Sequence, residues 1–357
     1  MTNEEINACV SEESGVRRFR SPEYNWDFNL VTGHFTRWGK TDDDDPIAAP
    51  SPEILDIEIS SGNCNGKCPY CYKGNDTKTE KTHMTLETFD LIMSKFNKNL
   101  GQIALGITGL NANPDFHRIL ESARHKWRVI PNFVTNGLGM TNELADYYAK
   151  ICGAVAVSIN QNIQGGKETC YEAVNKLLKA GLKQTNIHCM ISEETFDFAL
   201  EVLKDIKEGK IPGLNAVVFL GLKPKGSGSD KKVLSQEKFE SLVAVCLALG
   251  IPFGFDSCSA HKFERAVESL PLPDDAKVSF KSLSEPCEAF GLFSIYVNAK
   301  GLAYPCSFCE GEPDFRGFDI KTADDVLTYW NSRVMQIWRQ RSLREGRKCL
   351  VFPEINL

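Results

Sequence analysis

The sequence predicts an α/β protein built on a parallel sheet, and three observations support this fold class. Short apolar runs of strand length alternate with longer segments whose apolar residues recur at helical spacing. Six such strand–helix units follow one another between residues 53 and 250. A further apolar run, "IPFGF", ends the series. This alternation is typical of a parallel sheet covered by helices, either open and doubly wound or closed into a barrel or partial barrel.

The elements of these units can be assigned in chain order. In the first predicted helix, apolar side chains recur on one face at the spacing of an amphipathic helix, as in Leu86, Phe89 and Met93. The predicted strands are "EILDIEIS" (53–60), "QIALGI" (102–107), "VIPNFV" (129–134), "AVAVSI" (154–159), "NIHCMI" (186–191) and "AVVFLGL" (216–222). The predicted helices lie near 85–96, 116–127, 142–151, 168–181, 195–209 and 236–249.

The segments that flank these units differ from them in composition and in predicted secondary structure. We expect an N-terminal extension over residues 1–52, the α/β part over 53–250, and a smaller cysteine-rich domain over 251–357 that has more turns and fewer helices. Aromatic residues in the extension predict a short hairpin packed on the main body. A last helix is expected near 323–339, and its buried stripe would consist of Val326, Trp330, Val334, Ile337 and Trp338.

The composition limits the possible functions and locations. Of the 357 residues, 42% are hydrophobic and 25% are charged, which is usual for a soluble globular protein. The net charge of −6 argues against a broad nucleic-acid surface, so no nucleic-acid partner is expected. The N-terminus lacks the pattern of a secretory signal, and no run is long enough to span a membrane. We therefore expect a cytoplasmic protein whose 13 cysteines are mostly reduced thiols or metal ligands.

Three of these cysteines lie close together directly after the first predicted strand, in "SGNCNGKCPYCYKGN". Cys64, Cys68 and Cys71 thus lie at the carboxyl ends of the strands, where parallel sheets bind their ligands. A zinc ion needs a fourth ligand, for which His83 is the nearest downstream candidate. Buried core thiols are a second interpretation, although the surrounding glycine, proline and lysine make a poor core segment. The third is a four-iron cluster with one iron left open for a small molecule.

The stretch "CNGKCPYC" resembles the C-x3-C-x2-C motif of the radical S-adenosylmethionine (radical SAM) enzymes. The resemblance implies a partial (β/α)6 TIM-like barrel in which three thiolates hold a four-iron, four-sulfur (4Fe-4S) cluster. S-adenosylmethionine would chelate the open iron and be cleaved by one electron to a 5'-deoxyadenosyl radical. The electron would come from a low-potential donor such as flavodoxin or ferredoxin, within the range that iron–sulfur proteins span.

The same resemblance suggests residues that bind S-adenosylmethionine. An aromatic residue before the last cysteine would lie by the adenine. The Gly-Gly-Glu stretch that many members carry at the end of the second strand reads "GITGL" here, without the acidic residue. Polar residues at the ends of the third and fourth strands would contact the ribose, with ordinary turn residues as the alternative. The candidates are Tyr70, Gly106, Thr108, Asn136, Ser158 and Asn160.

A second cysteine group follows in the C-terminal part. Between Cys287 and Cys306 the spacing around Gly301 is similar to the C-x(9-15)-G-x4-C signature of SPASM and twitch domains. A hairpin turning at "NAKG" would bring the two cysteines together. The resemblance implies an auxiliary 4Fe-4S cluster, with a zinc site as the alternative. Its predicted ligands are Cys258, Cys287, Cys306 and Cys309, and Cys349 is an alternative to Cys309.

Other features leave the function partly open. The six histidines form no ligand-spaced pair, and no general base stands out. The glycine-rich "KPKGSGS" (223–229) lacks Walker spacing and is either a mobile loop or an anion site that could reach the cofactor or substrate. The family resemblance favours hydrogen-atom abstraction from a ribosomally made peptide. Oxidation or rearrangement of a small molecule or nucleotide derivative is an alternative, and a non-catalytic iron–sulfur or zinc protein is another.

Overall fold

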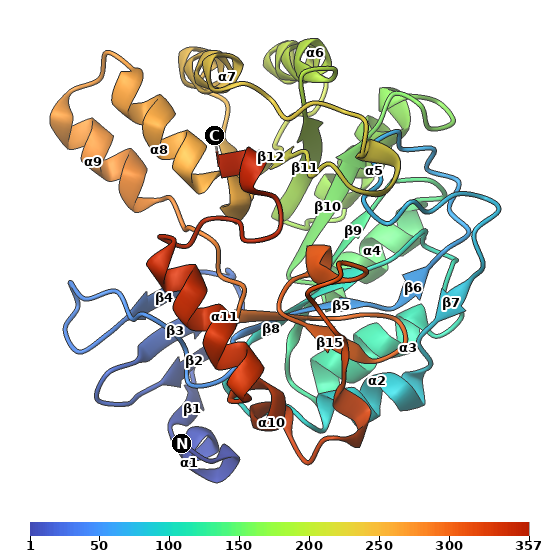
Figure 1. Ribbon diagram of the computed structural model, residues 1–357. Coiled ribbons are helices and arrows are strands. Elements are labelled where there is room, and N and C mark those ends of the chain that lie inside the picture. The colour runs from blue at the N-terminus through green and yellow to red at the C-terminus, as the bar shows by residue number, and fades with distance from the viewer. Residues whose placement is uncertain (357) are drawn as a thin grey trace.

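One ten-stranded sheet forms the centre of the protein in the computed structural model, which describes residues 1–356 (Figure 1). Seven neighbouring strands of this sheet are parallel to one another. From one edge inward they are β13 (Phe253–Phe255), β12 (Ala216–Gly221), β11 (Gln184–Ile191), β10 (Ala154–Ile159), β9 (Ile130–Thr135), β8 (Gln102–Gly106) and β5 (Ile54–Glu58). The α/β prediction is therefore confirmed.

A helix connects each of these strands to the next and covers the outer face of the curved sheet (Figure 1). Two of the helices begin at threonine N-caps, Thr85 and Thr141, whose side chains accept a backbone N–H of the first turn. The last one ends at Gly250, which adopts the left-handed conformation. The helices are α2 (Leu86–Met93), α3 (Phe116–Glu121) with a π-helical turn over Ser122–Lys126, α4 (Asn142–Ile151), α5 (Lys167–Lys179), α6 (Phe196–Lys207) and α7 (Gln236–Leu249).

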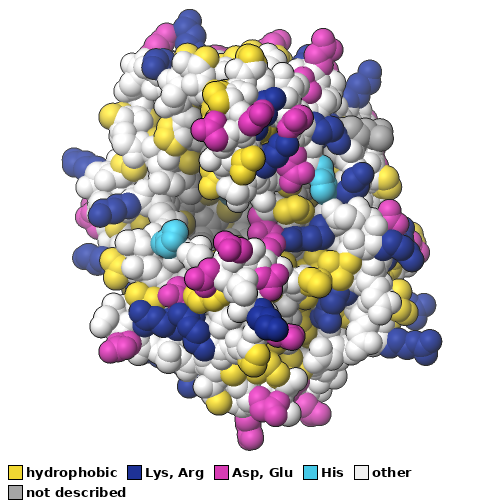
Figure 2. Space-filling view, turned by 90° about the vertical axis from the view of Figure 1, so that its left-hand side faces the viewer, with side chains coloured by type: hydrophobic (Ala, Val, Ile, Leu, Met, Phe, Trp, Pro, Cys, Tyr) yellow, Lys and Arg dark blue, Asp and Glu magenta, His cyan; other side chains and the backbone are white. Residues whose placement is uncertain are grey.

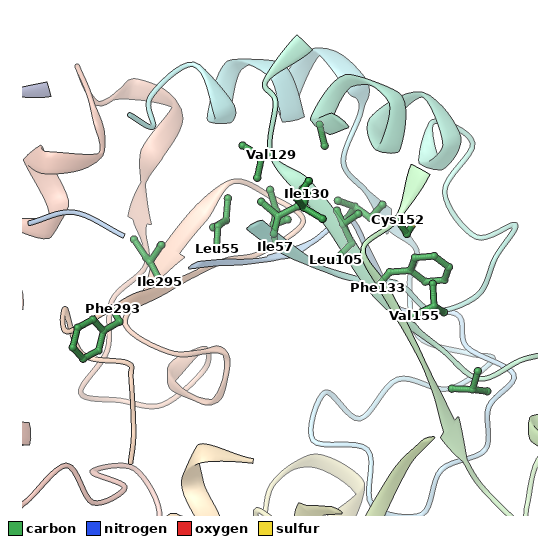
Figure 3. Close-up of a cluster of buried hydrophobic side chains, with 14 of the residues drawn as sticks. Leu55, Ile57, Leu105, Val129, Ile130, Phe133, Cys152, Val155, Phe293 and Ile295 are labelled. Atoms are coloured by element: carbon green, nitrogen blue, oxygen red, sulfur yellow. The ribbon is translucent and has the colours of Figure 1, made fainter. Parts of the chain in front are cut away.

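Alternation along β5 separates the core from the inside of the partial barrel. Leu55 and Ile57 are at most 1% exposed and join the apolar layer beneath the helices (Figure 3). Asp56 and Glu58 point to the opposite face, because successive strand residues alternate sides. The first strand therefore places two carboxyl groups on the inner side of the sheet.

The N-terminal extension forms an antiparallel sheet of its own, and the hairpin predicted for its aromatic stretch is present as the last two strands of that sheet. A helix, α1 (Asn3–Ala8), precedes four strands that pair in sequence order. Trp26 is fully buried, and its indole N–H donates to Asn99 at 2.8 Å, which ties the sheet to the barrel. The strands are β1 (Val10–Glu13), β2 (Val16–Phe19), β3 (Asn25–Asn29) and β4 (Phe35–Trp38).

The C-terminal part continues the central sheet. The strand β14 (Ser294–Val297) pairs in parallel with β5, and β15 (Leu302–Tyr304) and β16 (Phe318–Asp319) follow antiparallel. The hairpin between β14 and β15 is where the sequence predicted it. Two helices were not predicted, α8 (Ala260–Ser269) and α9 (Asp274–Ser282). In α9 no side chain is buried, so its apolar pattern was weak. In α8 the buried face includes Lys262 and two alanines, which give a less apolar pattern in the sequence.

The predicted final helix is two helices, α10 (Val326–Trp330) and α11 (Arg333–Arg344). The chain leaves the helical path at Asn331, and Ser332 caps the second helix by accepting the N–H of Met335. This break changes which side chains face the core. Val334 and Ile337 are 59% and 54% exposed, so their place in the predicted buried stripe was wrong, and Met335 is buried instead.

Candidate functional site

The first cysteine group lies in a long loop that leaves the carboxyl end of β5. The base of this loop is closed by two short antiparallel strands, β6 (Ser60–Ser61) and β7 (Thr82–His83). Inside the loop, the backbone N–H of Cys64 donates to Asp76 at 2.9 Å, and that of Cys71 donates to Cys68 at 3.3 Å. The loop is therefore held at both its base and its tip.

Two sulfur atoms of this group lie beside a glycine. A Cβ atom on Gly66 would lie 3.3 Å from Cys64 Sγ and 3.5 Å from Cys68 Sγ, so a side chain there would be tight against the first and in contact with the second. Asn160, at the end of β10, donates to the Gly66 carbonyl at 2.6 Å and to Cys68 Sγ at 3.1 Å. A buried amide thus supports the loop from the opposite side of the barrel.

Burial and neighbouring thiols make Cys64 and Cys68 hard to ionise without a cation. Burial raises the pKa of the Cys64 thiol, and burial together with Cys71 and Cys64 raises the pKa of Cys68 to about 12. Iron is a positive centre that deprotonates coordinating thiols. In residues 1–356, no three Cys, His, Asp or Glu side chains, His83 included, are grouped closely enough to hold one metal ion. In an iron–sulfur cluster each thiolate binds a different iron, so the three sulfurs need not share one ion.

The residues predicted to bind S-adenosylmethionine lie around this loop. The Tyr70 hydroxyl donates to the Ile159 carbonyl at 3.3 Å, at the end of β10. The Thr108 carbonyl accepts from Cys64 Sγ at 3.4 Å, and Asn136 Nδ2 would lie 3.6 Å from a Cβ on Gly66. Four of the six candidates, Tyr70, Thr108, Asn136 and Asn160, thus approach the cysteine loop. Their roles toward the cofactor remain predictions.

Two candidates have less distinctive surroundings. Ser158 is half-buried within β10, where it pairs with His188 of β11. Gly106 ends β8 and lies in register with Glu58 of β5. That register matters because "GITGL" lacks an acidic residue. Glu58, which the sequence analysis did not single out, supplies a buried carboxyl group beside Gly106. The sequence could have indicated Glu58, because it lies two residues after Asp56 and therefore on the same face of the strand.

The second cysteine group gathers residues from four separate segments, because Cys306 and Cys309 share one turn. The β14–β15 hairpin brings Cys287 near Cys306, and the Cys309 side chain hydrogen-bonds to Cys306 and lowers the pKa of the Cys306 thiol. Burial raises the pKa of Cys258 and raises that of Cys287 to about 12. Cys258 and Cys287 would therefore ionise most readily beside a positive centre.

Cys349 belongs to the same group. A thiolate at Cys349 would raise the pKa of Cys258, Cys287 and Cys309, because it lies near each of these thiols. Cys309 is 0% exposed inside a small apolar cluster, whereas Cys349 is half-buried. Cys309 and Cys349 therefore both remain predicted candidates for the fourth ligand of an auxiliary cluster.

A cavity of about 320 Å³ lies between the two cysteine groups. Tyr70 and Tyr72 of the first loop form part of its wall, and the wall also includes Cys258, Cys287 and Cys306 of the second group. The charged side chains of the wall come from the barrel strands, their loops and the segment after Cys287. They are Asp56, Lys223, Asp256 and Glu288. One space is therefore bordered by the loop that carries the first cysteine group, through Tyr70 and Tyr72, and by three cysteines of the second group.

Residues 59–225 match the model of the Radical SAM superfamily. The chain contains a radical SAM domain. The matched segment runs from the end of β5 to the loop after β12, so it includes the first cysteine group and most of the parallel sheet. The match confirms the resemblance to radical SAM enzymes that the C-x3-C-x2-C motif predicted.

Similar proteins extend this likeness beyond the matched segment. An uncharacterized protein of Archaeoglobus fulgidus is 21% identical over 373 aligned positions, which cover 95% of this chain and 82% of that protein. The structure of SuiB from Streptococcus suis bound to the precursor peptide SuiA has a TM-score of 0.64 at 14% identity, over 82% of this chain and 67% of SuiB. At such identity the likeness shows a shared fold.

A second solved structure gives the same result. The enzyme anSMEcpe with bound AdoMet and the Cp18Cys peptide has a TM-score of 0.59 at 17% identity. The match covers 85% of this chain and 88% of that one. Both matches cover more of this chain than the radical SAM domain alone, so the fold they share includes part of the C-terminal region.

The residues present fit the cofactors of a radical SAM domain, a 4Fe-4S cluster and S-adenosylmethionine. Cys64, Cys68 and Cys71, three free thiols on one loop, would hold a cluster that keeps one iron open. When bound, the pair supplies a one-electron cleavage of the sulfonium carbon–sulfur bond. The five cysteines of the second group suit a further 4Fe-4S cluster, for which four thiolates are the usual ligands.

On the face shown in Figure 2, acidic and basic side chains are interspersed rather than gathered into a basic patch. Among residues 1–356, no helix combines the length and the apolar character needed to cross a bilayer.

Proposed function

We propose that this radical SAM enzyme abstracts a hydrogen atom from an unactivated carbon of a ribosomally made peptide. The observation that carries the proposal is the cavity between the loop of the first cysteine group, which contributes Tyr70 and Tyr72, and the cysteines of the second group. A substrate carbon held there would lie near the site of S-adenosylmethionine cleavage on one side. On the other side it would lie near an auxiliary cluster able to bind the substrate or accept an electron.

Each cysteine group has a distinct part in this proposal. Cys64, Cys68 and Cys71 would hold the cluster that binds S-adenosylmethionine, and Tyr70 would pack near the adenine. The second group would hold the auxiliary cluster through Cys258, Cys287 and Cys306, with Cys309 or Cys349 as fourth ligand. A low-potential protein such as flavodoxin or ferredoxin would supply the electron.

The cavity walls suggest what this chain's own residues do for the substrate. Ile54, Met190 and Leu220 form apolar wall, which excludes water from a reactive carbon. Asp56 has no hydrogen bond or ion pair within residues 1–356, and burial raises its pKa to about 6. A carboxyl group with this pKa is suited to accept a proton near neutral pH.

The preference for a peptide rests on structural neighbours whose bound ligands are peptides, SuiA in one case and Cp18Cys in the other. A second candidate is oxidation or rearrangement of a small molecule or nucleotide derivative. The volume of the cavity supports this second candidate, because about 320 Å³ lies near the lower end of the 300–1,000 Å³ typical of small-ligand pockets.

The test is anaerobic reconstitution with iron and sulfide, reduction with titanium citrate, and addition of S-adenosylmethionine. We expect 5'-deoxyadenosine and methionine, together with about eight irons per chain if both sites hold 4Fe-4S clusters. Absence of 5'-deoxyadenosine from protein with an intact cluster would refute the enzymatic proposal. Peptides from neighbouring genes, deuterated at candidate carbons, would then identify the substrate by deuterium transfer into 5'-deoxyadenosine.

A further inference from the structure

The loop over residues 223–229, "KPKGSGS", contacts both cysteine groups. It follows β12 and contains a short 3-10 turn at Gly226–Gly228. From its sequence, this segment was predicted to be either a mobile loop or an anion site. In the structure it contacts other protein groups on both of its sides.

On one side, the Lys225 side chain hydrogen-bonds to the turn that carries Cys306 and Cys309. Its ammonium donates to the Phe308 carbonyl at 2.9 Å and to the Glu310 carbonyl at 2.6 Å. It also pairs with the Glu312 carboxylate at 2.6 Å. The Lys225 side chain is 17% exposed, so these three bonds are largely shielded from water. Hydrogen bonds that involve a charged group are stronger than neutral ones.

On the other side, Gly226 and Ser227 lie against the first cysteine loop. The Ser227 N–H donates to the Cys71 carbonyl at 2.9 Å. Gly226 has a φ of +58°, and a Cβ there would overlap the Cys71 carbonyl and lie 2.6 Å from that of Tyr72. Only glycine permits both this conformation and this approach.

The two cysteine segments also touch each other directly. The rings of Tyr72 and Phe308 lie 4.7 Å apart, and Lys73 pairs with Glu310. Tyr72 and Phe308 line the cavity, so these contacts define part of its wall. A site of this kind must be held within about 0.5 Å of its working geometry.

We propose that Lys225 and Gly226 are positioning residues, which fix the 306–310 turn against the 64–74 loop and so set the shape of the cavity between them. This inference rests on the proposed function only in taking the two cysteine groups as cluster sites. It predicts that a change on either side of the 223–229 loop is transmitted to the opposite cysteine segment.

The test is hydrogen–deuterium exchange by mass spectrometry on the full-length reconstituted protein, with electron paramagnetic resonance of both reduced clusters. Lys225→Met should raise exchange in 306–312 and also in 64–74 by about tenfold, and should alter the auxiliary-cluster spectrum. Lys225→Arg keeps the charge and the donors, so it should restore much of the protection. Gly226→Ala should displace 64–74 first and should alter the spectrum of the cluster on that loop.

Two matched controls isolate the effect. Lys231→Met removes a lysine whose ammonium pairs with the neighbouring Asp230. Gly213→Ala places a side chain at a similar φ of +85°, where a Cβ has no neighbour within 4 Å. Both should leave the two segments as in the parent protein.

The inference is overturned if Lys225→Met changes exchange only within 306–312 or in neither segment. It is also overturned if the controls produce the same pattern. If Lys225→Met does not fold, Lys225→Arg and Gly226→Ala decide the question by the same criterion. The parent protein's production of 5'-deoxyadenosine is scored separately, so failure of the proposed function would not be mistaken for failure of this inference.

Discussion

The two cysteine groups are built in opposite ways. The first takes its three thiols from eight consecutive residues on one loop, which follows one strand. The second takes five thiols from segments spread over residues 258–349, and they meet only after the hairpin, the short helices and the C-terminal segment have packed. A local group survives changes elsewhere in the fold, whereas an assembled group depends on many long-range contacts.

The largest expected effect comes from breaking the local group. Cys68→Ser removes one of only three ligands, so S-adenosylmethionine cleavage should fall at least about 100-fold, a loss of more than about 2.7 kcal/mol of transition-state stabilisation. Iron should fall to about four per chain, because the second group keeps its own thiols. Iron analysis and 5'-deoxyadenosine formation measure both. Cys9→Ser, in the N-terminal extension, is the control and should change neither.

A mutation in the assembled group should separate iron content from cleavage. In the double variant Cys287→Ser/Cys306→Ser only three thiols of the group remain, so the auxiliary iron should be lost, again leaving about four irons per chain, while reductive cleavage of S-adenosylmethionine continues at a reduced rate. The same assays apply, with deuterium transfer from substrate as a third measurement. Equal loss of cleavage in this double variant and in Cys68→Ser would show that the two groups are not independent.

The support behind the first group should have a smaller effect. Asn160→Ala removes the hydrogen bond to the Gly66 carbonyl and the contact with Cys68. Leaving such buried groups unpaired costs about 1–3 kcal/mol. We expect a lower melting temperature and slower cluster incorporation, followed by calorimetry and by absorbance during reconstitution. Asn162→Ala, at an exposed position on the same loop, should behave as the parent protein.

The smallest expected effect concerns the cavity between the groups. Burial raises the pKa of Asp56 from 3.8 to about 6, so its ionised form is disfavoured in the folded state. Its contribution to stability is present below about pH 4 and is lost as pH rises through 6. Asp56→Asn should therefore stabilise the protein at pH 7.5 by about 1–2 kcal/mol and have little effect at pH 4.

Urea denaturation of the cluster-free protein at the two pH values measures this difference. Asp146→Asn, at an exposed position in α4, is the control. A gain of equal size at both pH values would mean that the Asp56 carboxyl group does not titrate as described.

The same contrast explains what the sequence could predict. The barrel strands and the first cysteine group follow from local patterns, since apolar periodicity and the spacing of Cys64, Cys68 and Cys71 are properties of short segments. Asn160 was a candidate, but its bond to Gly66, 94 positions away, depends on strands closing around the loop. The inclusion of Cys349 in the second group likewise depends on the packing of the last helix and tail.

Some errors had local causes. The break at Asn331 and Ser332 interrupts an otherwise continuous helical pattern, so Val334 and Ile337 were assigned to the wrong face. The first two strands of the N-terminal sheet were missed because they are only four residues long and rich in charged residues. The contacts of Lys225 carry no sequence signal beyond the flexibility of the glycines that follow it.

The pairing of β14 with β5 has a consequence for biosynthesis. The edge of β5 that β14 covers is available as soon as the barrel strands leave the ribosome, but its partner, Ser294–Val297, is made more than 230 residues later. Until then the nascent chain presents an open strand edge, which is a template for unwanted pairing. A chain truncated before residue 294 should therefore tend to aggregate, even though its radical SAM segment is entire.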